Sequence, residues 1–175
     1  SGTKSEKKLT SLCKKHNIPC LRIKEDFKKY GVNEWGTRYH KPPKDWDQKT
    51  PTGRQRRFVS DMFLPIEGGI IIEQKNSDKH GTTEEKVFYD KEKIQLGVYG
   101  KKHALWYVFT GEVAKDASVY KDFEKRVKKQ KLPVKVIWGW DGFEKELKKL
   151  SFVKEGETAN KNNVEYYFNI LMDNQ

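Results

Sequence analysis

Cysteine is nearly absent from this sequence, and long uncharged apolar stretches are missing altogether. Its two cysteines, Cys13 and Cys20, cannot build a disulfide scaffold, and no cysteine or histidine pair has the spacing of a zinc site. No segment approaches the ~20 apolar residues that a membrane-spanning helix needs, and nothing at the start resembles a secretory signal. We therefore expect an intracellular, cytoplasmic protein that makes no membrane contact.

Apolar residues are also scarce, at 35% of the 175-residue chain. The 13% aromatic content adds volume per residue, and apolar residues gather in segments, which favours a folded domain over a disordered chain. A chain of this length can bury roughly two thirds of the surface that its unfolded state exposes. No internal repeat or long linker divides it, so we predict a single domain over residues 1–175.

Positive charge is in excess: 36 lysines and arginines stand against 25 aspartates and glutamates, for a formal net charge of +11. Such an excess favours binding to polyanions, because basic side chains that meet phosphates release condensed counterions. Solubility alone is the other interpretation of this excess. We expect nucleic acid as the partner.

Apolar periodicity predicts how the elements alternate. Leu9, Leu12, Cys13 and His16 lie at i, i+3, i+4 and i+7, which is typical of one helical face, and Asn17 is a plausible stop. The unbroken isoleucine run at 70–72 favours a central strand that is buried on both faces.

The predicted elements follow one another without long interruption after residue 57. In order they are a helix over 5–16, an extended segment over 18–23, strands over 57–65 and 70–75 with a turn at 66–69, a helix from Thr82 or Thr83 to about Gly97, a strand over 104–110, a basic helix over 117–131, a buried strand over 133–138, and helices over 141–150 and 163–172. Hairpins come early and βαβ crossovers late. We therefore predict an α/β fold with a mixed central β-sheet flanked by helices.

Charged residues end the most apolar of these strands. Glu73 and Lys75 are two residues apart, so a strand places them on one face, roughly 7 Å apart. Asp61 lies on the preceding strand, and the hairpin can bring its carboxylate beside Glu73. Two converging carboxylates repel each other, and a hard divalent cation such as Mg²⁺ relieves that repulsion. Such a cation can activate water and neutralise charge on a phosphate, while Lys75 would hold or deprotonate the attacking water.

Asp61, eleven residues, and then Glu73-x-Lys75 form a pattern that resembles the PD-(D/E)XK nuclease superfamily. The stretch is most similar to phage-type junction-resolving endonucleases, although Ser60 stands where the family often has proline. The resemblance covers roughly residues 5–140 in element order. It implies a restriction-endonuclease-like fold, Mg²⁺-dependent hydrolysis with Mn²⁺ able to substitute, a 3′-hydroxyl product, and a bacterial or phage-like setting.

In that family a glutamate of an N-terminal helix often joins the site, and Glu6 is the matching residue. Spacing supports it independently, because Glu6 lies on the same helical stripe as Leu9 and Cys13 and so borders the inward face. The resemblance therefore implies Asp61, Glu73, Lys75 and Glu6 as the catalytic set, with Asp61 and Glu73 as metal ligands.

Residues 31–57 show no sustained periodicity and combine aromatic with basic side chains, which favours a functional loop region that contacts DNA. Other candidates follow Lys75 in sequence. The nucleic-acid-binding candidates are Arg38, His40, Lys41, Arg54, Arg56, Arg57, Lys79 and His80.

Within the nuclease class we favour a sequence-specific endonuclease of restriction type that acts as a homodimer, because two strands need two cuts. A Holliday-junction resolvase, or another structure-selective nuclease, is the nearest alternative. An RNA endonuclease and a non-catalytic, basic nucleic-acid-binding module also stay open.

Overall fold

The computed structural model describes residues 2–22, 51–52, 61–64, 69–77, 82–95, 99, 104–112, 118–132 and 134–150. Among these residues, three strands follow the first helix, and helices and strands then alternate. Their order is α1 (Gly2–Lys15), β1 (Leu21–Arg22), β2 (Met62–Leu64), β3 (Ile70–Asn76), α3 (Thr82–Gln95), β4 (Ala104–Thr110), α4 (Ser118–Lys129), β5 (Val134–Trp138) and α5 (Gly139–Lys149). The predicted turn at 66–68 and the helix at 163–172 lie outside the described residues.

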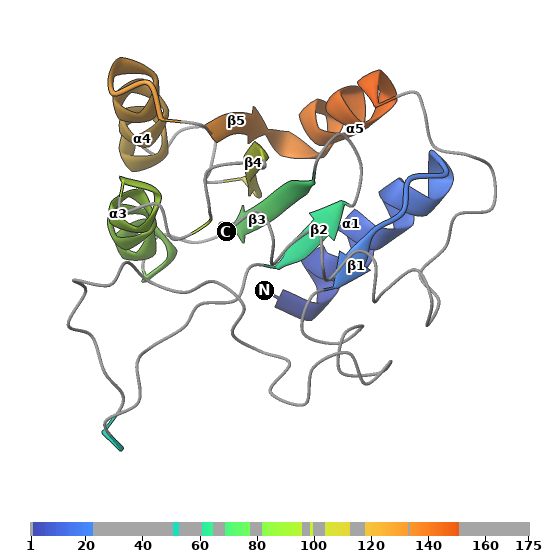
Figure 1. Ribbon diagram of the computed structural model, residues 1–175, viewed down its shortest axis with the longest axis horizontal. Helices are drawn as coiled ribbons and strands as arrows, with labels where there is room; N and C mark the ends of the chain where they lie inside the picture. Colours follow the sequence, from blue (N-terminus) through green and yellow to red (C-terminus); the bar gives the residue numbers. More distant parts are fainter. Residues whose placement is uncertain are drawn as a thin grey trace.

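The described strands form one five-stranded sheet in the order β1-β2-β3-β4-β5. β2 is antiparallel to both of its neighbours, whereas β4 and β5 run parallel to β3. α3 and α4 cover one face of the sheet, and α1 and α5 cover the other (Figure 1). The predicted α/β fold with a mixed, helix-flanked sheet is confirmed.

β3 is the middle strand, and its apolar residues divide between two cores. Ile71 packs under α3 and α4 with Tyr107 and Phe123, while Ile72 lies on the α1 and α5 side with Trp106. Both isoleucines are fully buried, so the prediction of a strand buried on both faces is confirmed.

α1 ends as predicted, at Asn17. This residue adopts a left-handed conformation with φ 54°, which asparagine tolerates better than most residues. Its N–H donates to Lys14 O at 3.1 Å, and the N–H of Ile18 donates to Cys13 O at 2.9 Å. These two bonds satisfy carbonyls that the end of a helix leaves unpaired.

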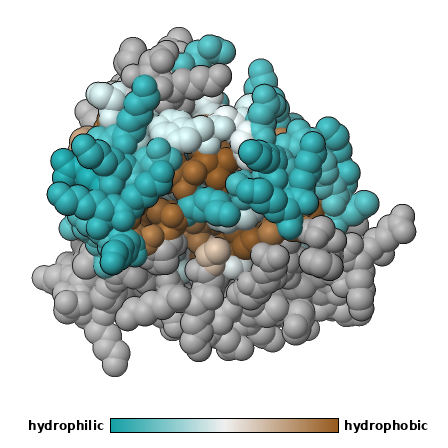
Figure 2. All heavy atoms as spheres, turned by 90° about the horizontal axis from the view of Figure 1, so that it is seen from above, coloured by the Kyte–Doolittle hydropathy of each residue, from teal (hydrophilic) through white to brown (hydrophobic). Residues whose placement is uncertain are grey.

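β5 differs from its prediction. It is the outermost described strand on its side of the sheet, and within it Ile137 is buried while Lys135 is exposed. Figure 2 views the molecule from the β5 side and shows a hydrophobic strip between hydrophilic atoms of the flanking helices. The prediction of a buried strand is wrong, because an apolar run reads alike in a central strand and in an edge strand shielded by helices.

Across the residues that the structure describes, no helix has the length and apolarity needed to cross a bilayer.

Candidate active site

β3 carries Glu73 and Lys75 on the face that α3 and α4 cover. The two side chains point the same way, and Lys75 Nζ lies 3.9 Å from Glu73 Oε2. Their partners across the parallel ladder are Tyr107 and Phe109 of β4, which belong to the core on that face. The geometry is the one that strand alternation predicts.

Asp61 lies at the bend just before β2, so the hairpin brings it to Glu73. The β2–β3 register pairs Met62 with Ile72, which leaves Asp61 beside Glu73. The backbone N–H of Gln74 donates to Asp61 Oδ2 at 3.0 Å, and the Asp61 and Glu73 carboxyl groups lie close enough for each to shift the pKa of the other. The two carboxyl groups therefore converge at one point.

Burial makes this pair difficult to ionise. Glu73 is only 4% exposed, and burial together with the nearby Asp61 raises the pKa of Glu73 well above its ordinary value. Burial also raises the pKa of Asp61, although less than it would without the Gln74 N–H and Lys75. Like charges this close need either a shared proton or a cation between them.

The donor chemistry fits a hard cation. Asp61 and Glu73 offer carboxylate oxygens, and Mg²⁺ is bound in proteins by one or two carboxylates with water and phosphate oxygens completing its shell. No group of three or more His, Cys, Asp or Glu side chains arranged to hold a metal occurs among the described residues. A cation here would therefore have two side-chain ligands from the described part of the chain.

Lys75 also contacts a carboxylate that sequence reasoning missed. Asp90, on α3, lies 3.4 Å from Lys75 Nζ through its Oδ2 and 3.0 Å from Lys93 Nζ through its Oδ1. The hydroxyl of Tyr107 donates to the same carboxylate. A signal was present in the sequence, because Asp90 falls on the stripe of Val87 and Ile94, both of which face inward.

These carboxylates keep Lys75 charged. Burial alone would lower the pKa of Lys75, but the attraction of Glu73, Asp90 and Asp61 outweighs it and raises the pKa above its ordinary value. Lys75 is therefore an ammonium at neutral pH. An ammonium can hold the attacking water, and both roles expected for Lys75, holding that water and deprotonating it, stay predictions.

Tyr99 is buried in the core on the same face of the sheet. Burial and the nearby carboxylates of Glu73, Asp90 and Asp61 raise the pKa of Tyr99 well above its ordinary value. The Nζ of Lys93 lies 5.3 Å from the centre of its ring. Tyr99 adds an apolar wall to the site, which strengthens electrostatic interactions inside it.

Glu6 lies at the same end of the sheet, but with another partner. Its Oε2 is 2.9 Å from Arg22 Nη2, and Arg22 pairs in register with Met62, next to Asp61. In the described structure the carboxylate of Glu6 is joined to Arg22 and not to Asp61 or Glu73. A metal-binding role for Glu6 stays a prediction.

The residues expected to contact DNA lie outside the described part of the chain. The predicted loop region at 31–57 is described only at 51–52, and the two later candidates, at 79 and 80, also lie outside the described residues. The residues concerned are Arg38, His40, Lys41, Arg54, Arg56, Arg57, Lys79 and His80.

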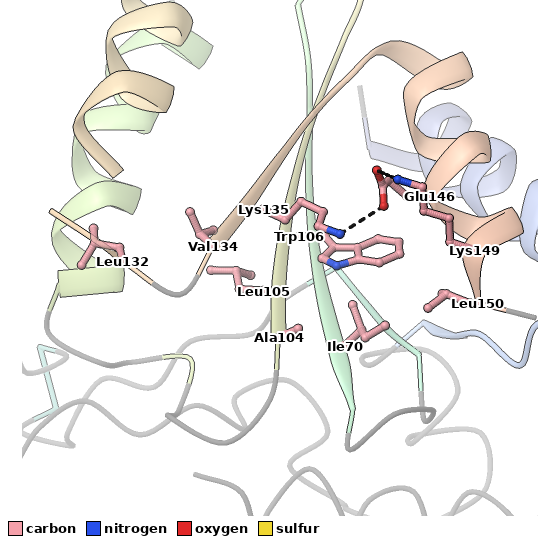
Figure 3. Close-up of a pocket in the computed structure, with 10 residues that line it drawn as sticks. All are labelled: Ile70, Ala104, Leu105, Trp106, Leu132, Val134, Lys135, Glu146, Lys149 and Leu150. Atoms are coloured by element: carbon pink, nitrogen blue, oxygen red, sulfur yellow. Dashed lines mark hydrogen bonds and ion pairs between the residues drawn. The ribbon is translucent and has the colours of Figure 1, made fainter. Parts of the chain in front are cut away.

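A cavity of ≈550 Å³ lies at the opposite end of the sheet (Figure 3). Ile70, Ala104 and Val134, the first residues of the three parallel strands, line it together with the end of α5. Its acid, Glu146, is already paired with Lys135 at 3.1 Å and Lys149 at 3.2 Å. The cavity is separate from the convergent carboxylates and offers no comparable unbalanced charge.

The chain matches no family model, no curated protein and no solved structure. The resemblance to PD-(D/E)XK nucleases stays a prediction that depends on Asp61, Glu73 and Lys75.

Proposed function

We propose that this protein is a Mg²⁺-dependent endonuclease that hydrolyses phosphodiester bonds of DNA. The observation that carries the proposal is the convergence of Asp61 and Glu73 beside Lys75, a lysine held as an ammonium by surrounding carboxylates. A basic module that only binds nucleic acid has no use for two carboxylates that burial makes costly to ionise.

Each side chain has a definable role. Asp61 and Glu73 would hold the cation, and the backbone N–H of Gln74 orients Asp61 through its hydrogen bond. When bound, Mg²⁺ would supply charge neutralisation at the scissile phosphate and lower the pKa of a coordinated water. The Lys75 ammonium would donate hydrogen bonds to the attacking water and to the phosphate as its negative charge grows.

The fold supports a restriction-endonuclease-like architecture. A mixed sheet has helices on both faces, and the Glu73-x-Lys75 pair stands near the end of its middle strand, after a buried isoleucine run. Asp61 comes from the antiparallel neighbour of that strand. This is the arrangement that the resemblance implies.

The net charge of +11 favours a nucleic acid as substrate, and the resemblance to PD-(D/E)XK nucleases favours DNA. A restriction-type enzyme should act as a homodimer on a sequence read in duplex DNA. A junction resolvase would use the same hydrolytic site on a branched substrate. The preferred DNA substrate distinguishes these two classes.

The test compares supercoiled plasmid, linear duplex, a four-way junction and single-stranded RNA, each incubated with Mg²⁺ or with EDTA. Wild-type protein is run beside Lys75→Ala and beside Lys128→Ala, which removes the same charge from an exposed position on α4. We expect Mg²⁺-dependent cleavage by wild type and Lys128→Ala, and a loss of at least ~10²-fold in Lys75→Ala.

The preferred substrate then identifies the class. Discrete fragments from linear duplex indicate a restriction-type enzyme, whereas cleavage confined to four-way junctions indicates a resolvase. Cleavage of RNA alone would contradict the DNA assignment. Binding without cleavage of any substrate, unchanged by Lys75→Ala, would contradict the nuclease itself.

A further inference from the structure

We infer that Asp90 is a positioning residue of this site, which holds the Lys75 ammonium at its working place beside the carboxylate pair. The inference rests on the proposed nuclease function for its catalytic consequence. Its structural content, that Asp90 anchors Lys75, stands on the geometry alone.

The ammonium group of Lys75 lies closer to the Asp90 carboxylate of α3 than to the Glu73 carboxylate of its own strand. Lys75 Nζ lies 3.4 Å from Asp90 Oδ2 but 3.9 Å from Glu73 Oε2. Lysine has a flexible four-carbon stem, so the position of its ammonium is decided by the anions around it. Of the two carboxylates that form ion pairs with Lys75, the nearer one comes from α3.

Asp90 is itself held on several sides. It is 3% exposed; Lys93 binds its Oδ1 at 3.0 Å, and the Tyr107 hydroxyl donates to its Oδ2. α3 and β4 thus fix the carboxylate between them. A buried anion held this way cannot move aside when its neighbour changes partners.

Charge accounts for why Lys75 needs such an anchor. If every group is counted at its formal charge, the three carboxylates Asp61, Glu73 and Asp90 exceed the two lysines beside them by one negative charge. A divalent cation on Asp61 and Glu73 would reverse that sign and repel Lys75. Asp90 lies outside the metal pair and keeps its charge, so it would retain the ammonium when the cation enters.

The ion pair with Lys93 and the hydrogen bond from Tyr107 give the Asp90 carboxylate two partners besides Lys75. A purely structural tie between α3 and the sheet predicts that Asp90→Asn lowers stability but leaves kcat of the folded enzyme unchanged. A positioning role predicts a loss of kcat in the folded enzyme.

The experiment uses Asp90→Asn in the full chain, with Asp122→Asn as the matched control. Asp122 pairs with Arg126 on the exposed face of α4, so its replacement makes the same chemical and charge change elsewhere. The first readout is the ¹⁵N–¹H signal of the Lys75 ammonium in metal-free protein, assigned by its loss in Lys75→Ala. The second is kcat and KM for cleavage of the preferred DNA.

In Asp90→Asn we expect the Lys75 ammonium signal to disappear or shift, because its exchange with water is no longer slowed. We expect kcat to fall by about 10²-fold with KM changed less than about threefold, as for loss of a group that acts in the transition state. Asp122→Asn should keep the Lys75 signal and a kcat close to that of wild type.

Asp90→Glu covers the case in which Asp90→Asn fails to fold. It keeps the charge but moves the carboxylate outward by one methylene, so kcat should fall about tenfold or more at unchanged KM. A folded Asp90→Asn with the wild-type Lys75 signal and wild-type kcat would overturn the inference, and so would an Asp90→Glu with wild-type kcat. If wild type cleaves nothing, the proposed function fails, while the ammonium signal still decides whether Asp90 holds Lys75.

Discussion

Glu73 shows how one buried side chain couples folding to pH. Its folded-state pKa is raised, first by burial and then by Asp61. The folded chain therefore holds a proton that the unfolded chain releases as the pH rises. The stability that depends on this proton is complete below the unfolded pKa, about 4.3, and is lost as the pH rises through the higher folded pKa.

Glu73→Gln should therefore stabilise the metal-free protein, increasingly so at higher pH. Glutamine has nearly the shape of the protonated acid and never ionises, so it avoids the cost of a buried charge. Each kcal/mol relieved should raise Tm by about 2–4 °C in a chain of this size. Thermal unfolding in EDTA between pH 4.5 and 8.5 measures the difference.

The control for that series is Glu92→Gln, an exposed position on α3. Its effect on Tm should be small and should not grow with pH. A Glu73→Gln effect that is the same at every pH would contradict the raised pKa of Glu73.

Added Mg²⁺ should reverse the pH effect in wild type. A cation bound to Asp61 and Glu73 requires both to be deprotonated, so its affinity should increase as the pH rises and binding should release protons. At a hundredfold excess over Kd the gain would be about 2.7 kcal/mol. We expect a Mg²⁺-dependent rise in Tm that is larger at pH 8 than at pH 6 and is lost in Glu73→Gln. A rise of equal size in Glu73→Gln would place the cation elsewhere.

At the scale of elements, the ends of β3 and β4 are joined just beyond the site. The side-chain amide of Gln74 donates through Nε2 to Thr110 Oγ1 at 2.6 Å, and the backbone N–H of Ser77 donates to Thr110 O at 2.9 Å. Gly111 follows with φ +97°, and a Cβ there would lie 2.5 Å from Ser77 O. This junction fixes the end of the strand that carries Glu73 and Lys75.

Gly111→Ala should consequently be strongly destabilising. The left-handed conformation costs an alanine about 1–2 kcal/mol, and the contact with Ser77 backbone should add about 1–3 kcal/mol of overpacking. Gly139→Ala is the matched control, because Gly139 has φ +73° but open space around the added Cβ. Denaturant unfolding should show the larger loss at Gly111, and equal losses would mean that the junction yields to the extra methyl group.

At the scale of the whole molecule, the net charge of +11 should dominate association with DNA. Binding measured with Ca²⁺ in place of Mg²⁺ should weaken by at least about tenfold between 50 and 200 mM salt, since several counterions return to the DNA. Fluorescence anisotropy with a labelled duplex measures this. A binding constant that is nearly independent of salt would contradict a phosphate-directed interface.

Much of the architecture could be read from the chain because it depends on short-range periodicity. The 3.6-residue period predicts α1 and α4, and the two-residue period predicts that Glu73 and Lys75 share a face. The isoleucine run predicts the middle strand. These inferences need only the geometry of a single element, which the backbone dictates.

The tertiary structure alone decided which elements meet. Periodicity turns Asp90 toward the interior, but only the pairing of β3 with β4 and the packing of α3 on that face bring it to Lys75. Only the tertiary structure likewise shows that Arg22 forms an ion pair with Glu6 and that β5 lies at an edge of the described sheet. Contacts between elements depend on strand order and on the shared burial of distant side chains, and neither is encoded in a local pattern.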